Sequence, residues 1–340
     1  MSITLEDIAR LAGVNPATVS RTISKPEKVK PKTRQKIETI IKQTGYIPNL
    51  LARGLAKGRT DSVGILTSFT TNPYIIEIIE SLERQLTADG TYMYLCNCQH
   101  DFELEKKYLN ELMQRKIDGL FVIETPSLNT KYNFYAKNNY DCPVIQINQH
   151  LKPYKDSFIV CCDQKPGIEE IFNEVKKNRL YPFILLIPAE KSYSYMIKER
   201  LFIKWFKKNN LTKKQAQCIK LEIIGPNDEK SVWSSYKAAK ELIPRFKPRS
   251  ILTGNDLMAM GVLSAAHELG ISIPRDLAIA GVDNTLFART SMPALSTIDL
   301  RMGEVGNKAA ELYRNFKNNR QTYYDKVIIL PSIFIRRKTF

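Results

Sequence analysis

The hydrophobic pattern of the chain divides it into a short helical segment and a long alternating one. In the first fifty residues, apolar side chains recur every three or four positions, which is the spacing of one buried helix face. From residue 62 onward, short runs rich in Val, Ile, Leu and Phe alternate with longer amphipathic stretches. The pattern therefore predicts a small helical domain followed by a larger α/β region.

The first predicted helix begins at Leu5. Thr4 precedes Asp7 by three residues, which is the spacing of a capping box. Gly13 follows the last apolar position of this helix and can adopt the positive φ of a tight turn.

A second helix is predicted directly after that turn. Asn15 is a good N-cap, and Pro16 suits the first helical position because its missing N–H costs nothing there. Its buried side would be Val19 and Ile23, and its outward residues are Asn15, Pro16, Ala17, Thr18, Ser20 and Arg21.

A third helix is predicted over 31–44, ending at Gly45. Three short helices with a glycine-linked pair are typical of the helix-turn-helix, whose second helix enters the DNA major groove. A generic helical bundle is the alternative. The short segment 49–60 contains Gly54, so we expect a linker that folds only against DNA or a partner helix.

The α/β region predicts two lobes of doubly wound parallel sheet. The first set of strands is 63–67, 92–96, 119–123, 144–147 and 158–161, with helices at 74–88, 103–116 and 130–138. The second set is 183–187, 219–223, 251–253 and 278–281, with helices at 166–177, 195–208, 231–243 and 256–269. Late strands at 295–298 and 327–330, around a helix at 302–317, fit either lobe.

The predicted domains follow from this division. They are a DNA-binding domain over 1–48, a hinge over 49–60, a first lobe over 61–161 plus 291–324, and a second lobe over 162–290 plus 325–340. A cleft between such lobes, at the carboxyl ends of their strands, is the usual place for a small ligand.

The distribution of charge along the chain indicates a binding partner. The formal net charge is +16, and residues 1–60 hold twelve Lys and Arg against four Asp and Glu. A lysine-rich surface that only aids solubility is the alternative reading, but this concentration of charge in one segment favours phosphate backbones as its partner.

The sequence predicts a cytoplasmic protein. There is no apolar leader of signal-peptide type, and no run approaches the roughly 18 apolar residues of a membrane span. We therefore expect the six cysteines to be reduced thiols.

Several motifs in colinear order resemble the LacI/GalR transcriptional regulators over essentially the whole chain. In the first fifty residues they are Thr4-Leu5-Glu6-Asp7-Ile8-Ala9, Ala12-Gly13-Val14, Ala17-Thr18-Val19-Ser20-Arg21, Thr33-Arg34 and Gly45-Tyr46-Ile47-Pro48-Asn49. Further on they are Ile117-Asp118-Gly119, Asn255-Asp256-Leu257-Met258-Ala259-Met260-Gly261, Ile273-Pro274-Arg275-Asp276 and Gly281-Val282-Asp283-Asn284. The resemblance implies a helix-turn-helix headpiece, a hinge helix and a two-lobe core like that of periplasmic binding proteins. It also implies a homodimeric repressor that reads a pseudo-palindromic double-stranded operator.

The resemblance also implies which residues contact DNA. Base reading would fall to Pro16, Ala17 and Arg21, and the phosphate contacts to Thr4, Asn15, Thr18, Ser20, Thr33 and Asn49. Leu55, with Ala52 and Arg53 beside it, falls where the family inserts a leucine between base pairs in the minor groove; packing between two hinges is the alternative. Lys30 stands where many relatives have a serine that caps the third helix.

In the core, the resemblance implies an effector pocket for a small sugar, sugar phosphate or sugar acid. The matching residues are Phe69, Tyr74, Asn148, Lys198, Asn255 and Asp283, with Arg200 in place of Lys198 if the match slips by one or two positions. A carboxylate such as Asp283 can accept hydrogen bonds from two sugar hydroxyls. No cofactor and no metal is expected.

Two other classes of protein are alternatives. An enzyme of this architecture is disfavoured because the chain has neither a glycine-rich phosphate loop nor a nucleophile elbow, and its histidines lie in no recognisable motif. A transport-type sugar-binding protein would have an export signal and no basic headpiece. Cys96, Cys98 and His100 fit a zinc site in spacing alone, and an ordinary strand face is the preferred interpretation.

Overall fold

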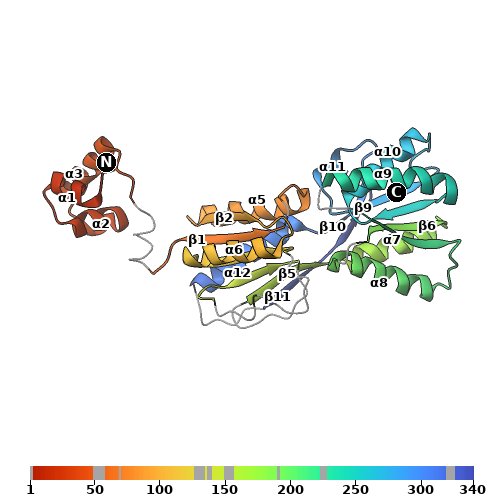
Figure 1. Ribbon diagram of the computed structural model, residues 1–340, viewed down its shortest axis with the longest axis horizontal. Coiled ribbons are helices and arrows are strands. Elements are labelled where there is room, and N and C mark those ends of the chain that lie inside the picture. The colour runs from red at the N-terminus through yellow and green to blue at the C-terminus, as the bar shows by residue number, and fades with distance from the viewer. Residues whose placement is uncertain are drawn as a thin grey trace. The chain divides into compact units, whose positions relative to one another are not determined.

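The computed structural model describes residues 3–48, 58–68, 70–125, 135, 140–148, 157–189, 192–222, 228–318 and 326–340. The chain forms two compact units, Met1–Asp61 and Ser62–Phe340, whose elements are labelled in Figure 1. Within the described ranges, no helix is both long and apolar enough to cross a membrane.

The first unit is a three-helix domain. Its elements are α1 (Leu5–Ala12), α2 (Pro16–Ser24), the short 3₁₀ helix η1 (Pro26–Lys28) and α3 (Pro31–Thr44). They enclose one small core of Ile8, Ala9, Ala12, Val19 and Ile37. The predicted helices are confirmed, because the apolar face that each shows in the sequence is the face that packs here.

Local hydrogen bonds fix where α1 begins. The Asp7 backbone N–H donates to the Thr4 hydroxyl at 3.2 Å, and the Thr4 N–H donates to the Asp7 carboxylate at 3.0 Å. Gly13 ends the helix at φ 64°, a conformation that strains other residues. By contrast, Lys30 precedes α3 without a side-chain cap, which agrees with the loss of the capping serine there.

The second unit contains two lobes, each built on one six-stranded sheet. The strand order of the first lobe is β11-β5-β4-β3-β1-β2, and all its pairings are parallel. The strands are β1 (Ser62–Thr67), β2 (Tyr92–Asn97), β3 (Gly119–Ile123), β4 (Val144–Ile147), β5 (Ser157–Asp163) and β11 (Val327–Pro331). Helices α5 (Pro73–Ala88) and α12 (Met302–Asn318) pack on one face, and α6 (Phe102–Gln114) packs on the other.

The second lobe repeats this architecture with the strand order β12-β10-β9-β8-β6-β7. Its strands are β6 (Phe183–Pro188), β7 (Ala216–Leu221), β8 (Ser250–Thr253), β9 (Ala278–Val282), β10 (Ser296–Asp299) and the antiparallel β12 (Ile333–Ile335). Helices α7 (Lys165–Lys177) and α8 (Tyr193–Lys208) pack on one face, and α9 (Asp228–Phe246) and α10 (Asp256–Glu268) pack on the other. The short α11 (Leu286–Thr290) follows β9.

The late segments of the chain correct the predicted lobe boundaries. β10 was assigned to the first lobe within 291–324, but it pairs with β9 of the second. β11 was assigned to the second lobe within 325–340, but it pairs with β5 of the first. Both strands are short, four residues in β10 and five in β11, so their composition fits either sheet, and only the strand pairing distinguishes them.

The chain passes between the lobes three times, after β5, after β10 and after β11. These crossings lie side by side. The Ser332 N–H donates to the Asp163 carbonyl at 3.0 Å, and the Gly167 N–H donates to the Ser332 hydroxyl at 3.0 Å. A Cβ at Gly167 would lie 2.6 Å from Ile298, so only glycine allows this close packing.

Other differences from the sequence expectation are local. β7 begins earlier than predicted, at Ala216, and neither β12 nor α11 was predicted. Cys96 lies in β2, whereas Cys98 and His100 follow its end, so the three do not share a strand. The helix predicted over 130–138 lies outside the described residues except for Tyr135.

Candidate functional site

The outward face of α2 is the candidate DNA-reading surface. Asn15, Pro16, Ala17, Ser20 and Arg21 are exposed and Thr18 is half-buried, while Val19 and Thr22 face the core. The Asn15 side chain accepts a hydrogen bond from the Ala17 N–H at 2.9 Å, which fixes the start of the helix. The helix therefore presents a short polar edge from a rigid scaffold.

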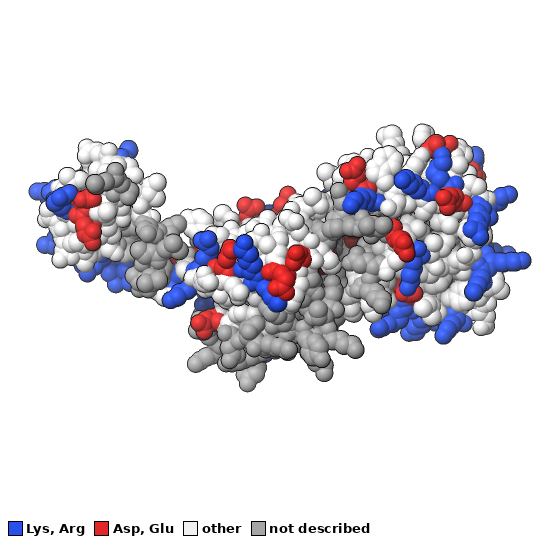
Figure 2. All heavy atoms as spheres, in the orientation of Figure 1, with Lys and Arg blue, Asp and Glu red and all other residues white. Residues whose placement is uncertain are grey.

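Arg21 differs from two other arginines of the headpiece in its pairing. Arg10 forms an ion pair with Asp7 at 2.7 Å, and Arg34 forms one with Glu38 at 2.6 Å. In the described part of the chain, no carboxylate lies within 4.0 Å of the Arg21 side chain. Figure 2 shows basic side chains around the edge of this unit and acidic ones in one central group. Arg21 is thus available for an external acceptor.

The predicted phosphate-contacting residues have different environments. Ser20 is exposed, and Thr33 is half-buried in the first turn of α3. Thr4 is exposed, but its hydroxyl donates to Asp7 at 2.8 Å. Asn49 and the predicted minor-groove residues Ala52, Arg53 and Leu55 lie outside the described residues.

A polar cluster occupies the carboxyl ends of strands from both lobes. Glu124 follows β3, Asn148 follows β4 and Asp283 follows β9. All three have positive φ, at 46°, 56° and 114° respectively. Positive φ is uncommon for residues with a Cβ and is often found at ligand sites, where the backbone aims a side chain.

Tyr74, in the first turn of α5, links two of these residues. Its hydroxyl donates to the Glu124 carboxylate at 2.9 Å and accepts a hydrogen bond from the Asn148 amide. The same amide lies 3.4 Å from the Met302 sulfur. Burial, assisted by the negative charges of Glu124 and Asp283, holds the pKa of Tyr74 well above its ordinary value. The phenol is therefore neutral and acts as a hydrogen-bond donor.

Lys198 supplies the positive charge of the cluster. This residue of α8 is only 1% exposed, and its ammonium donates to the Ser194 hydroxyl at 2.7 Å. The ammonium also lies 5.3 Å from the centre of the Tyr195 ring. Burial lowers the pKa of Lys198 to about 8, and the charges of Asp283 and Glu124 oppose that shift. The three ionisable groups therefore share one electrostatic environment.

Several buried polar atoms border this cluster without a partner in the described structure. They are the hydroxyls of Thr67 and Ser68 at the end of β1, and the side-chain carbonyl of Gln164 after β5. The Gln164 amide donates to Ser194 at 2.9 Å, which connects it to Lys198. Because β5, β4, β3 and β1 are neighbours in the sheet, these residues line one edge. Buried polar atoms are normally satisfied, so unpaired ones at a strand-end cluster fit a ligand site.

The structure brings together four of the predicted effector residues, namely Tyr74, Asn148, Lys198 and Asp283. Arg200 is exposed, so Lys198 is the basic residue of the cluster. Asn255 has a structural task, since its side chain accepts from the Met258 N–H at 2.9 Å as the N-cap of α10. Phe69 lies outside the described residues.

Glu124 was missed by the sequence analysis. Its signal was a lone carboxylate directly after the five buried residues of β3, at a strand end. Nothing in the spacing alone separates such a residue from an ordinary loop carboxylate. Its hydrogen bond to Tyr74 reveals its place in the cluster.

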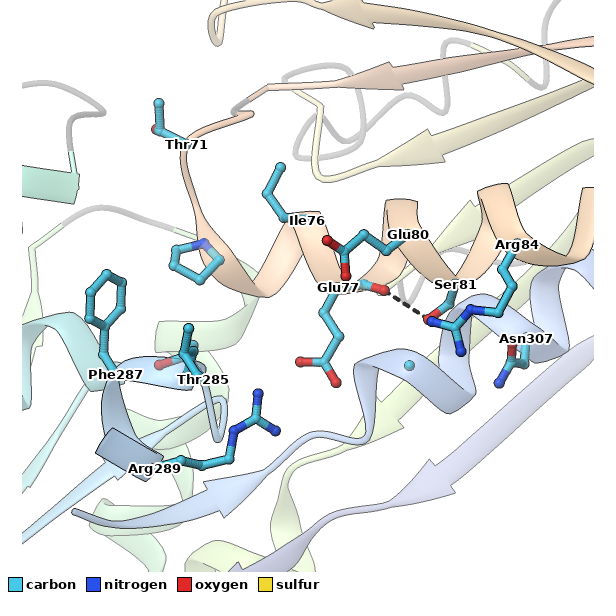
Figure 3. Close-up of a pocket in the computed structure, with 13 residues that line it drawn as sticks. Thr71, Ile76, Glu77, Glu80, Ser81, Arg84, Thr285, Phe287, Arg289 and Asn307 are labelled. Atoms are coloured by element: carbon cyan, nitrogen blue, oxygen red, sulfur yellow. Dashed lines mark hydrogen bonds between the residues drawn. The ribbon is translucent and has the colours of Figure 1, made fainter. Parts of the chain in front are cut away.

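Apart from this cluster, a crevice between the lobes lies beside α5, α11 and α12 (Figure 3). Its volume is about 610 Å³. Glu77 and Arg289 point toward one another across it, and Phe287 lies beside the start of α5. Burial raises the pKa of Glu77, while the charge of Arg289 lowers it. None of the residues that line this crevice belongs to the cluster around Lys198.

Comparisons with known proteins agree with this architecture. Residues 4–49 match the model of bacterial regulatory proteins of the lacI family, and residues 182–340 match that of a periplasmic binding protein-like domain. The chain is 28% identical over 339 residues to the HTH-type transcriptional repressor PurR of Pectobacterium carotovorum subsp. carotovorum (strain PC1), covering 98% of this chain and 96% of the relative. It is 27% identical over 340 residues to the HTH-type transcriptional regulator DegA of Bacillus subtilis (strain 168), covering 100% and 98%.

Solved structures show the same fold. A lac repressor dimer bound to operator and the anti-inducer ONPF aligns with a TM-score of 0.82 at 20% identity, covering 100% of this chain and 99% of that one. A LacI family transcriptional regulator from Enterococcus faecium with bound ribose aligns with a TM-score of 0.68 at 20% identity, covering 82% and 98%.

A helix-turn-helix headpiece joined to a two-lobe core with a polar inter-lobe cluster defines a DNA-binding transcriptional regulator with an effector-binding core, and not an enzyme. The chain belongs to the LacI family of helix-turn-helix regulators, with a periplasmic-binding-protein-like core.

Proposed function

We propose that the chain is a homodimeric repressor of carbohydrate-utilisation genes, controlled by a small sugar-type effector bound between the lobes of its core. The observation that carries this proposal is the cluster of Tyr74, Glu124, Asn148, Lys198 and Asp283, drawn from strand ends and helices of both lobes. A ligand that contacts both lobes stabilises one relative arrangement of them, which is the requirement for allosteric control.

The chemistry of the cluster suits a polyhydroxylated ligand. Each sugar hydroxyl both donates and accepts, and the cluster combines carboxylates with ammonium, amide and hydroxyl groups. Asp283 and Glu124 can accept from hydroxyls, while Lys198 and Asn148 can donate to them. The relative from Enterococcus faecium was solved with ribose, which supports a sugar as the ligand class.

A second copy of the chain is the proposed partner. Strand β2 is an edge of the first sheet, and it exposes Tyr92 by 62%, Tyr94 by 37% and Leu95 by 47%. Exposed apolar residues on an unpaired edge strand are unusual in a monomer and typical of interfaces. The structurally similar lac repressor was solved as a dimer on its operator, which supports the same arrangement here.

In the proposed operator complex, α2 lies in the major groove. Pro16 and Ala17 cannot form bidentate hydrogen bonds, so they would contact thymine methyl groups or sense steric fit. Arg21 would discriminate guanine through two hydrogen bonds to its O6 and N7. Leu55 would wedge between base pairs in the minor groove and bend the duplex, as the family resemblance implies.

The test of the DNA-binding proposal uses Arg21→Ala, with Lys42→Ala as a control because Lys42 is an exposed basic residue in the last turn of α3, outside the reading helix α2. We expect Arg21→Ala to weaken binding to the selected operator by about 1–3 kcal/mol, roughly 5- to 150-fold, while retaining most salt-dependent non-specific binding. The operator is obtained by selection from random duplexes and the affinity measured by titration. Equal losses for specific and random DNA would contradict base reading by Arg21.

The test of the effector proposal is a thermal-shift screen of pentoses, hexoses and disaccharides, followed by operator titration with each compound that stabilises the protein. A ligand that binds only the folded state raises its apparent stability in proportion to the logarithm of its concentration. Asp283→Asn should remove the shift, whereas Asp276→Asn, an exposed carboxylate of the same lobe, should keep it. A sugar that stabilises the protein without changing its operator affinity would refute allosteric control.

A further inference from the structure

The charge of the inter-lobe cluster restricts the class of effector. We propose that the effector carries no negative charge, and that Glu124 and Asp283 together exclude phosphorylated and carboxylated sugars. This proposal rests on the effector function proposed above and narrows it to an uncharged, hydroxyl-rich molecule.

Two carboxylates face one ammonium in this cluster. The negative charges of Glu124 and Asp283 both act on Tyr74, and both also act on Lys198. With all three ionised, these three groups together carry a charge of −1. A ligand phosphate or carboxylate would bring further negative charge into this buried environment, where Coulomb interactions are several-fold stronger than in water.

Lys198 is poorly placed to act as an anion clamp. The residue is 1% exposed, and its ammonium donates to Ser194 at 2.7 Å and lies over the Tyr195 ring. Its charge is opposed by Glu124 and Asp283. A Lys in this setting serves as a hydrogen-bond donor to a neutral oxygen, because a bound anion would compete with two fixed carboxylates for the same charge.

The remaining polar atoms at this edge suit hydroxyl groups better than anions. Tyr74 directs its proton to Glu124, so it does not donate to a ligand oxygen. The unpartnered carbonyl of Gln164 is an acceptor only and repels a phosphate oxygen. The hydroxyls of Thr67 and Ser68 can donate to or accept from a sugar hydroxyl. The site therefore offers acceptors that only a ligand with its own O–H or N–H donors can satisfy.

The experiment removes the excluding charges and asks whether the cluster becomes an anion site. Full-length wild type is compared with Glu124→Gln/Asp283→Asn, in which Lys198 is the remaining charge of the three. The probes are inorganic phosphate and ribose 5-phosphate, each against sodium chloride at equal ionic strength. Thermal unfolding at pH 7 reports binding. The matched control is Glu83→Gln/Asp276→Asn, which removes two carboxylates outside the cluster, on the exposed Glu83 and the partly exposed Asp276, and so changes the net charge equally.

Adding Lys198→Met to each protein separates the cluster from the basic headpiece, which also attracts phosphate. We expect no Lys198-dependent stabilisation of wild type or of the control by either probe. In the doubly neutralised variant, the affinity for ribose 5-phosphate should rise at least about tenfold, and Lys198→Met should abolish this gain. If the double variant fails to fold, Glu124→Gln alone should show a smaller Lys198-dependent gain in affinity for ribose 5-phosphate.

Two results would overturn the proposal. The first is Lys198-dependent binding of a sugar phosphate or sugar acid by wild type. The second is the absence of any gain in folded variants that lack one or both carboxylates. Neither depends on allosteric function: an anionic sugar that binds wild type and changes its operator affinity refutes the charge rule alone. If no compound changes operator affinity but the phosphate results are as expected, the proposed effector control fails and the charge rule stands.

Discussion

Asp256, the first residue of α10, is a buried carboxylate of the second lobe that accepts hydrogen bonds from β10 and from the start of α11. It is fully buried and accepts hydrogen bonds from the Thr285 N–H at 2.7 Å and from the Thr297 hydroxyl at 2.5 Å. Burial raises its pKa to about 6, although these hydrogen bonds and the charge of Arg337 act in the opposite direction. A Cβ at position 281 of β9 would lie 2.3 Å from the Asp256 carboxylate, so this position must be glycine.

This raised pKa predicts a pH-dependent stability. The folded protein retains a proton on Asp256 up to about pH 6, whereas the unfolded chain loses it near the ordinary aspartate pKa of 3.8. The free energy of unfolding should therefore contain a contribution that decreases as pH rises from about 4 to 6, with a slope approaching 1.4 kcal/mol per pH unit.

Denaturant unfolding of wild type and Asp256→Asn between pH 4 and 7 measures this slope by difference. Asp276→Asn is the control, because Asp276 is only partly buried and its pKa is lowered by its hydrogen bonds with Arg275. A wild-type slope that matches that of Asp256→Asn throughout the window would contradict the assignment.

At the residue scale, sequence reasoning named several side chains that the structure brings into one cluster, because their type and strand-end position suffice to place them. Asp283 directly follows β9, Asn148 directly follows β4, and Lys198 lies in α8, the helix that follows β6. Glu124 escaped because its partner Tyr74 is fifty positions earlier, and no spacing rule connects them. Asn255 was predicted to contact the ligand, and in the structure its side-chain oxygen caps α10. This capping depends on the extended backbone conformation of Asn255, which the sequence does not reveal.

Helices α5 and α12 pack closely in the first lobe because α12 has a glycine at their contact. A Cβ at Gly306 would lie 2.7 Å from the Ser81 Cβ and 2.8 Å from the Ile78 carbonyl oxygen. Both neighbours are rigid, so added volume has to separate the helices. Gly303, one turn earlier on α12, has its nearest such atom at 3.4 Å.

This difference predicts opposite effects of one substitution at two positions of one helix. Gly306→Ala should lower the free energy of unfolding by about 2–3 kcal/mol, through overpacking. Gly303→Ala should leave it unchanged or raise it by up to about 1 kcal/mol, since alanine favours the helix. Chemical denaturation of both variants is the measurement, and equal stabilities would show that α5 and α12 adapt at no cost.

At the element scale, strands and helices with strong periodicity were predicted within a few residues, whereas elements at lobe edges were not. β12 has three residues and α11 has five, too few for a period to show. The exchange of β10 and β11 between lobes has another cause. Which sheet such a short strand joins is determined by long-range pairing, and no local pattern records it.

For the whole molecule, the division into two units predicts two separable activities. The headpiece has its own core around Ile8 and Ile37, and the chain divides at Asp61. A fragment of residues 1–61 should show helical circular dichroism and salt-dependent retention on random DNA. The fragment 62–340 should be folded, bind the effector sugars and show no such retention. Retention of DNA by the fragment 62–340 would place part of the DNA-binding surface in the core.

The order of elements along the chain has a consequence for synthesis. One residue, Ser332, separates β11 of the first sheet from β12 of the second, and both are outer strands of their sheets. The Thr339 hydroxyl, seven residues further on, accepts from the Ser296 N–H at 2.8 Å and donates to the Ile279 carbonyl at 2.7 Å. On the ribosome, neither sheet is complete until residues 327–335 have emerged, long after the headpiece can fold. A nascent chain is able to bind DNA before it is able to sense its effector.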